Sequence, residues 1–132
     1  MASASEPRRG EVWLAALGAA RPGEPGKNRP VIVVSADQIT PPTPHALIVV
    51  VPLSSSRFPS QLRPAVGDVE GVDRPTEAGR HSPPARIPVS ASAIPRAIRG
   101  VARTRLLRRL GALEPVTLAE VERALALTLG LP

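Results

Sequence analysis

Residues 46–53 read Ala-Leu-Ile-Val-Val-Val-Pro-Leu, and residues 30–35 read Pro-Val-Ile-Val-Val-Ser. Both stretches are unbroken apolar runs rich in β-branched side chains, which is typical of strands buried on both faces. A further strand is predicted over residues 10–17, with Trp13 in the core. A weaker strand is predicted over residues 61–66, at an edge or a bulge, because Pro64 lacks the N–H that a sheet ladder needs.

The C-terminal part of the chain has the pattern of a helix over residues 117–129. Thr117 and Glu120 have the spacing of a capping box, and Gly130 is suited to a left-handed stop. Four apolar residues recur at the spacing of one helix face, namely Leu118, Val121, Leu125 and Leu129. Before the helix, a short strand near Ile98, a turn and a short element near Leu110 are expected. Several short strands followed by one packing helix predict a mainly β fold, with a small barrel-like sheet and a C-terminal α-helix.

The remaining stretches define the expected domain organisation. A chain of 132 residues suggests one domain, which we place at residues 10–132 after a flexible basic arm at residues 1–9. Glycines, prolines and charges dominate from residue 67 to residue 95, where only residues 85–89 have a strand-like pattern. We therefore expect a mobile loop over residues 70–95.

The charge of the chain favours anionic partners, with nucleic acid first and an anionic membrane surface second. The formal net charge is +6, the isoelectric point is about 11.5, and Lys27 is the only lysine. Arginine suits phosphate because its planar guanidinium can bond two oxygens at once. The abundance of Ala and Pro also indicates a GC-rich coding sequence, to which we attribute about half of the Arg excess.

Several classes of protein are disfavoured. There is no cysteine, so a disulfide framework and a thiolate zinc site are excluded. His45 and His81 are isolated from carboxylates, so we expect no metal site and no cofactor. Residues 1–10 are polar with no apolar run behind them, and no apolar stretch reaches the length of a membrane span. A soluble, cytoplasmic protein that does not bind membranes is expected.

The first candidate for chemistry is the loop-to-strand junction at residues 23–31, Gly-Glu-Pro-Gly-Lys-Asn-Arg-Pro-Val. Gly and Pro shape a loop that can approach a phosphate closely. Arg29 stands where this loop enters a strand, so its guanidinium would be held in place. A solvated surface arginine is the alternative, and local composition alone favours that alternative roughly two to one.

The second candidate is Pro-Leu-Ser-Ser-Ser-Arg at residues 52–57, directly after the most apolar strand. Hydroxyl groups at a strand end can donate to phosphate or stabilise a developing charge. Taken alone, an ordinary polar turn explains this stretch better. Serine-nucleophile chemistry is disfavoured, because there is no Gly-x-Ser-x-Gly elbow and nothing marks a histidine as the activating base.

The order of these segments is more specific than any one of them. Arg9-Gly10-Glu11-Val12-Trp13, then Gly-Glu-x-x-x-x-Arg-Pro-Val, then Val-Val-Pro-Leu-Ser-Ser-Ser resembles the MazF/PemK family of toxins. So does the later stretch with Ile98-Arg99, Arg105-Leu106 and Leu110-Gly111 before the helix. The resemblance covers most of the chain and weakens between residues 70 and 95.

The resemblance implies an SH3-like barrel assembled as a homodimer and silenced by a small acidic MazE-like antitoxin. It implies metal-independent cleavage of single-stranded RNA at short sequence motifs, leaving a 2′,3′-cyclic phosphate and a 5′-OH. Matching the family's motifs assigns catalytic roles to Arg29 and Ser54. The other residues expected to bind substrate are Glu24, Lys27, Asn28, Ser55, Ser56 and Arg99.

The chain departs from the family's pattern in two places. Ser54 stands where threonine is commoner, which keeps the hydroxyl but loses the methyl that restricts its rotamer. The stretch over residues 70–95 is longer and richer in proline than usual, so its contacts cannot be carried over. Two other functions stay open from sequence, a CcdB-like gyrase-binding toxin and a non-catalytic nucleic-acid-binding module.

Overall fold

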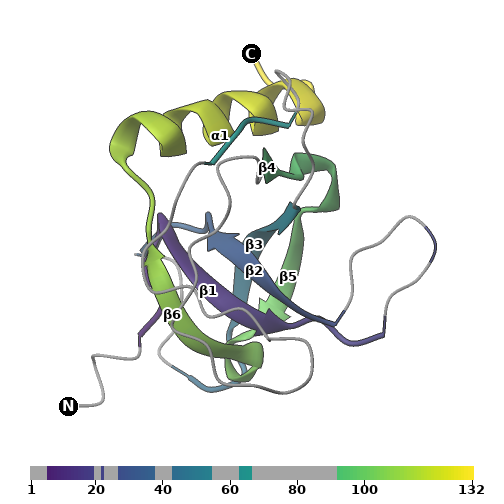
Figure 1. Ribbon diagram of the computed structural model, residues 1–132, viewed down its shortest axis with the longest axis vertical. Helices are drawn as coiled ribbons and strands as arrows, with labels where there is room; N and C mark the ends of the chain where they lie inside the picture. Colours follow the sequence, from purple (N-terminus) through teal and green to yellow (C-terminus); the bar gives the residue numbers. More distant parts are fainter. Residues whose placement is uncertain (1–5, 20–21, 23–26, 38–42, 55–62, 67–91) are drawn as a thin grey trace, which may run out of the picture.

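A computed structural model describes residues 6–19, 22, 27–37, 43–54, 63–66 and 92–132. Within them, antiparallel strands form a curled sheet, and one α-helix lies across one end of it (Figure 1). The strands are β1 (Glu11–Ala16), β2 (Asn28–Val33), β3 (Leu47–Ser54), β4 (Ser92–Ala93), β5 (Arg99–Ala102) and β6 (Leu106–Ala112). Two 3₁₀ turns, η4 (Pro95–Ala97) and η5 (Arg103–Arg105), flank β5, and the helix is α1 (Pro115–Leu129).

The sheet has the order β4-β3-β2-β1-β6, and β5 pairs with β3 next to β4. All pairings are antiparallel, and among the described strands none joins the two ends of this order. The sheet is therefore barrel-like without being closed. The prediction of a mainly β fold with a C-terminal helix is confirmed, as are the strands predicted over residues 10–17, 30–35 and 46–53.

The central strands are buried on both faces, as their continuous apolar sequences predict. Successive side chains of a strand point to opposite faces. Val12 of β1 packs in the cluster that includes Val121 of α1, whereas Trp13 packs in the cluster on the other face. Trp13 is only 3% exposed, which confirms its predicted place in the core. β2 and β3 are packed on both faces in the same way. The residues at the ends of these two strands are therefore held rigidly.

The start of α1 differs from the prediction. The helix begins at Pro115, and its N-cap Glu114 makes no side-chain capping hydrogen bond. The predicted capping box of Thr117 and Glu120 is therefore wrong. Proline is favoured at the first position of a helix, because its fixed φ is already helical and its missing N–H would have had no partner there. Pro115 thus starts the helix before Thr117 can cap it.

The buried face of α1 also differs in part. Val121 and Ala124 are its buried residues, and Leu118 and Leu125 pack partly against the core. Leu129, predicted on the same face, is 54% exposed. The last turn therefore carries its leucine away from the core. Gly130 ends the helix with a φ of 70°, as predicted.

The segments between the main strands are only partly described. Within residues 63–66, the strand predicted over 61–66 is reduced to isolated bridge residues, Arg63 and Ala65, and Ala65 bridges to Ser92. The strand predicted over residues 85–89 lies outside the described residues. Residues 92–95, which were expected to belong to a mobile loop, form β4 and the start of η4 instead. Backbone pairing with β3 on one side and with residues 64–65 on the other holds β4 in place.

The end of the proposed N-terminal arm contacts the rest of the molecule. Glu6 forms an ion pair with Arg103, and Arg9 forms one with Glu122 of α1. The division into an arm at residues 1–9 and a domain at residues 10–132 stays a prediction, and residues 1–5 lie outside the described part. No helix in that part has both the length and the apolar character needed to cross a lipid bilayer.

Candidate functional site

Arg29 is the second residue of β2 and lies opposite Ala15 of β1. Its side chain is half-buried and reaches toward β3, where Nη1 donates a hydrogen bond of 3.0 Å to the carbonyl oxygen of Leu53. Its Nε is buried and has no hydrogen-bond partner among the described residues. One edge of the guanidinium is thus anchored on β3, which fixes the orientation of the whole planar group.

Ser54 ends β3 beside Arg29. The register of β2 and β3 pairs Val31 with Pro52, and continuing it by two residues places Arg29 opposite Ser54. Residues directly opposite each other on neighbouring strands have side chains on the same face. The Ser54 side chain is half-buried and takes part in interactions of its own. The two residues assigned to catalysis from sequence are therefore brought together by the sheet.

Ser92 of β4 extends this pair into a row. It pairs directly with Ser54, is fully buried, and its Oγ has no hydrogen-bond partner in the part of the chain that the structure describes. Neighbouring strands lie about 4.8 Å apart, so Arg29, Ser54 and Ser92 span roughly 10 Å across three strands. The sequence analysis missed Ser92, because it lies in the stretch expected to be a loop. No local pattern marked it.

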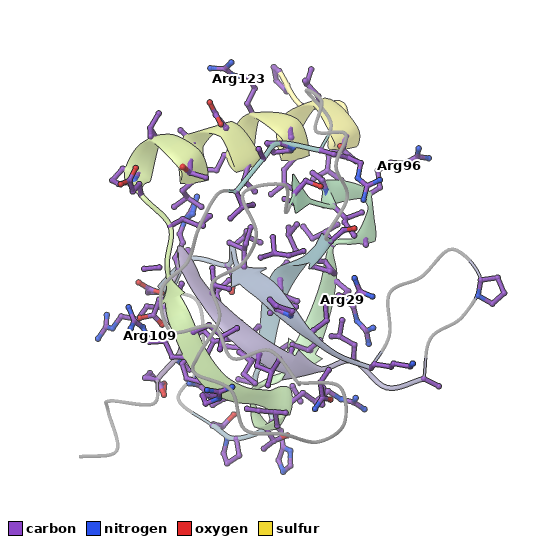
Figure 2. All side chains as sticks on the ribbon, viewed as in Figure 1. Arg29, Arg96, Arg109 and Arg123 are labelled. Carbon is purple, nitrogen blue, oxygen red and sulfur yellow. The ribbon has the colours of Figure 1, made fainter. Side chains whose placement is uncertain are left out.

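The charge of Arg29 is not neutralised by the described residues. Other arginines of the fold have carboxylate partners, for example Arg109, whose Nε lies 2.8 Å from Oε2 of Glu11. Within the described parts, no carboxylate pairs with Arg29. Figure 2 shows Arg109 well apart from Arg29, at the left of the view, where β6 lies. The row therefore combines an anchored cation with hydroxyl groups, an arrangement suited to an anion.

The remaining predicted substrate-binding residues are placed unevenly. Asn28 precedes Arg29 at the start of β2, and Lys27 is an exposed residue just before it with a φ of 63°. Arg99 is exposed on β5 and pairs with Val50, which is four residues or about 13 Å from Ser54 along β3. The structure does not bring Arg99 into the row. Glu24, Ser55 and Ser56 lie outside the described residues.

The described residues offer neither a group of metal ligands nor a histidine within reach of Ser54. In that part of the chain, no three carboxylate or imidazole groups gather where they could share a metal ion. His45 lies before the start of β3, whereas Ser54 ends this strand of 8 residues. At about 3.3 Å per residue, the two are more than 20 Å apart along the strand. The row of Arg29, Ser54 and Ser92 can instead bind a tetrahedral oxyanion and stabilise the negative charge that develops on it.

Comparisons with known proteins agree with this reading of the fold. The family model described as the PemK-like, MazF-like toxin of type II toxin–antitoxin systems matches residues 8–129. The Endoribonuclease MazF9 of Mycobacterium tuberculosis is 32% identical over 130 residues, covering 94% of this chain and 97% of that protein.

Solved structures show the same fold. An endoribonuclease in complex with its cognate antitoxin, from a mycobacterial species, has a TM-score of 0.68 at 23% identity, over 96% of this chain and 97% of the other. MazF from Deinococcus radiodurans has a TM-score of 0.62 at 24% identity, over 95% and 97% of the two chains. The family model spans nearly the whole chain, including every strand and the helix. This chain therefore belongs to the family of PemK-like, MazF-like toxins of type II toxin–antitoxin systems.

Proposed function

We propose that this toxin is a sequence-specific endoribonuclease that cleaves single-stranded RNA without a metal ion. The observation that carries the proposal is the position of Arg29, anchored on Leu53 beside Ser54 and without a carboxylate partner in the described residues. The relative from Mycobacterium tuberculosis is named an endoribonuclease, which supports the same reaction class.

The proposed reaction is an in-line attack of an RNA 2′-OH on the adjacent phosphorus. The bond from O2′ to phosphorus forms while the bond from phosphorus to O5′ breaks, giving a 2′,3′-cyclic phosphate and a 5′-OH. The 2′-OH loses its proton, and the leaving O5′ gains one. Negative charge grows on the non-bridging oxygens in the transition state, where Arg29 can donate two hydrogen bonds and Ser54 one.

We assign Arg29 an electrostatic role in this reaction. A guanidinium carries a positive charge, and its planar donors match the geometry of phosphate. Glu24, Lys27, Asn28, Ser55, Ser56 and Arg99 are proposed to bind flanking parts of the substrate. Arg99 would contact a more distant part of the RNA, because β5 holds it away from the row.

The proposed partners follow from charge and from the relatives. Solved complexes join a mycobacterial endoribonuclease to its cognate antitoxin, and MazE to MazF in Deinococcus radiodurans. We propose that this chain forms a homodimer and is silenced by a small acidic antitoxin, whose charge complements the net charge of +6. The cytoplasm, where RNA and a partner antitoxin are both present, is the proposed location.

A long RNA incubated with the purified protein in EDTA tests the proposal. We expect cleavage at defined sites, with products that carry cyclic phosphate and 5′-OH ends. A gyrase-binding toxin would leave the RNA intact, and a non-catalytic module would bind it without cutting. Loss of cleavage in EDTA with recovery in magnesium would show that the metal-independent mechanism is wrong.

A further inference from the structure

We infer that Ser92 is a third phosphate-binding residue of this site, donating a hydrogen bond to the RNA phosphate that Arg29 and Ser54 hold. The inference rests on the proposed function and adds a residue to it. It starts from a feature that the described fold does not explain, a hydroxyl group that is fully buried and has no hydrogen-bond partner among the described residues.

A buried hydroxyl without a partner destabilises a folded protein, and native structures rarely contain one. Its neighbour in β4, Ala93, is equally buried and carries no polar atom. Alanine at position 92 would fit the same narrow space without a buried polar group. The loss of stability caused by the Ser92 hydroxyl is offset only if a group outside the described fold forms a hydrogen bond with it.

The register of the strands places this hydroxyl next to the proposed phosphate position. Ser92 pairs with Ser54, so both side chains leave the sheet on the same face. Arg29 approaches from the other neighbour of β3, with its guanidinium already anchored on Leu53. A phosphate bound above Ser54 therefore has Arg29 on one side and Ser92 on the other.

Besides the Ser92 hydroxyl, two buried donors in or next to this row have no hydrogen-bond partner among the described residues. Arg29 Nε is one, and Arg63 Nε is the other. Arg63 lies two residues before Ala65, which bridges to Ser92. Three unsatisfied donors thus come from β2, from β4 and from the segment that β4 pairs with. An anion with several acceptor oxygens would satisfy donors of this kind, whereas a single water molecule would not satisfy all three.

The variant Ser92→Ala tests the inference, because its two effects have opposite signs. Without ligand, removing an unsatisfied buried hydroxyl should leave the melting temperature unchanged or raise it by about 3 to 6 °C. With ligand, losing a hydrogen bond to a charged phosphate should slow single-turnover RNA cleavage by about 10- to 100-fold. Binding of an RNA with a 2′-deoxy group at the cleaved nucleotide should weaken by at least several-fold.

Ser35→Ala is the matched control. Ser35 is half-buried, and unlike Ser92 its Oγ accepts a hydrogen bond of 3.2 Å from the N–H of Val49. It lies six residues from Arg29, beyond the other end of β2, or about 20 Å away. This variant should lose stability and keep the cleavage rate of the wild type.

The measurements separate this inference from the proposed function. If wild-type protein and Ser92→Ala cleave and bind RNA equally well, the inference is wrong and the function stands. If Ser92→Ala melts at a lower temperature, its hydroxyl serves the fold and the inference is again wrong. If the wild type does not cleave RNA, the proposed function fails, and comparing how tightly the wild type and Ser92→Ala bind the intact, unmodified RNA still decides whether Ser92 contacts the phosphate.

Discussion

Replacing Arg29 by alanine should abolish RNA cleavage while leaving the protein folded. The structural loss is one hydrogen bond, from Nη1 to the Leu53 carbonyl oxygen at 3.0 Å. Such a bond contributes about 1 kcal/mol net to stability, which lowers the melting temperature by roughly 3 to 6 °C. The catalytic loss is larger. Removing one preorganised donor to a developing oxyanion slows a reaction by about 100- to 1000-fold, and Arg29 supplies two donors and a charge.

Arg29→Lys separates the charge from the shape of the donor. Lysine keeps a positive charge but has no planar pair of donors, and its shorter reach forfeits the anchored geometry on β3. If orientation matters as the structure indicates, this variant should remain slower than the wild type by about 100-fold or more. Recovery to near the wild-type rate would show that charge alone suffices and that the anchoring on Leu53 has no catalytic consequence.

Arg109→Ala is the matched control for these variants. This variant removes the same charge from another strand and breaks the ion pair with Glu11. Arg109 lies well apart from Arg29 in Figure 2. Single-turnover cleavage of a defined RNA should fall far less in this variant, with circular dichroism confirming each fold. A wild-type rate in folded Arg29→Ala would refute the placement of the site. An equal loss in Arg109→Ala would show that general attraction of RNA, not the row, governs the rate.

Three further predictions concern Ser54, the 2′-OH of the substrate and the packing of the core. Ser54→Ala should slow cleavage by about 100- to 1000-fold, and Ser54→Thr should stay active because it keeps the hydroxyl; equal rates for both variants would remove Ser54 from the site. An RNA with hydrogen in place of the 2′-OH at the cleaved nucleotide should bind but resist cleavage, and efficient cutting would rule out internal attack. Ile32→Ala should lower the free energy of unfolding by about 2 to 5 kcal/mol in a urea titration, whereas Leu47→Ala, at a position that is 66% exposed, should change it by less than about 0.5 kcal/mol.

Local sequence patterns determined the strands and the general position of the helix. In the apolar runs at residues 30–35 and 46–53, consecutive apolar side chains point to both faces of a strand, so both faces must be shielded from water. The structure packs β2 and β3 in that way. The pairing of Arg29 with Ser54 came from the order of short motifs that the family shares. That order carries spatial information, because two strands adjacent in the sheet bring their ends together wherever the chain between them runs.

The start of α1 and the identity of its buried residues could not be predicted from local sequence patterns. Thr117 and Glu120 have a valid capping pattern, but Pro115 begins the helix earlier. Leu129 keeps the apolar spacing, yet which residues of α1 are buried depends on how far the core extends beneath the helix. Ala124 is buried at 0% exposure although alanine carries little signal of its own.

Ser92 shows most clearly what only the tertiary structure decided. In the sequence it is one serine among prolines, glycines and charges, more than thirty residues from Ser54. Pairing of β4 with β3 places the two serines side by side, buries one of them completely, and leaves its hydroxyl without a hydrogen-bond partner among the described residues. Burial and hydrogen-bond satisfaction are properties of the surroundings that long-range pairing creates, so no window of local sequence contains them.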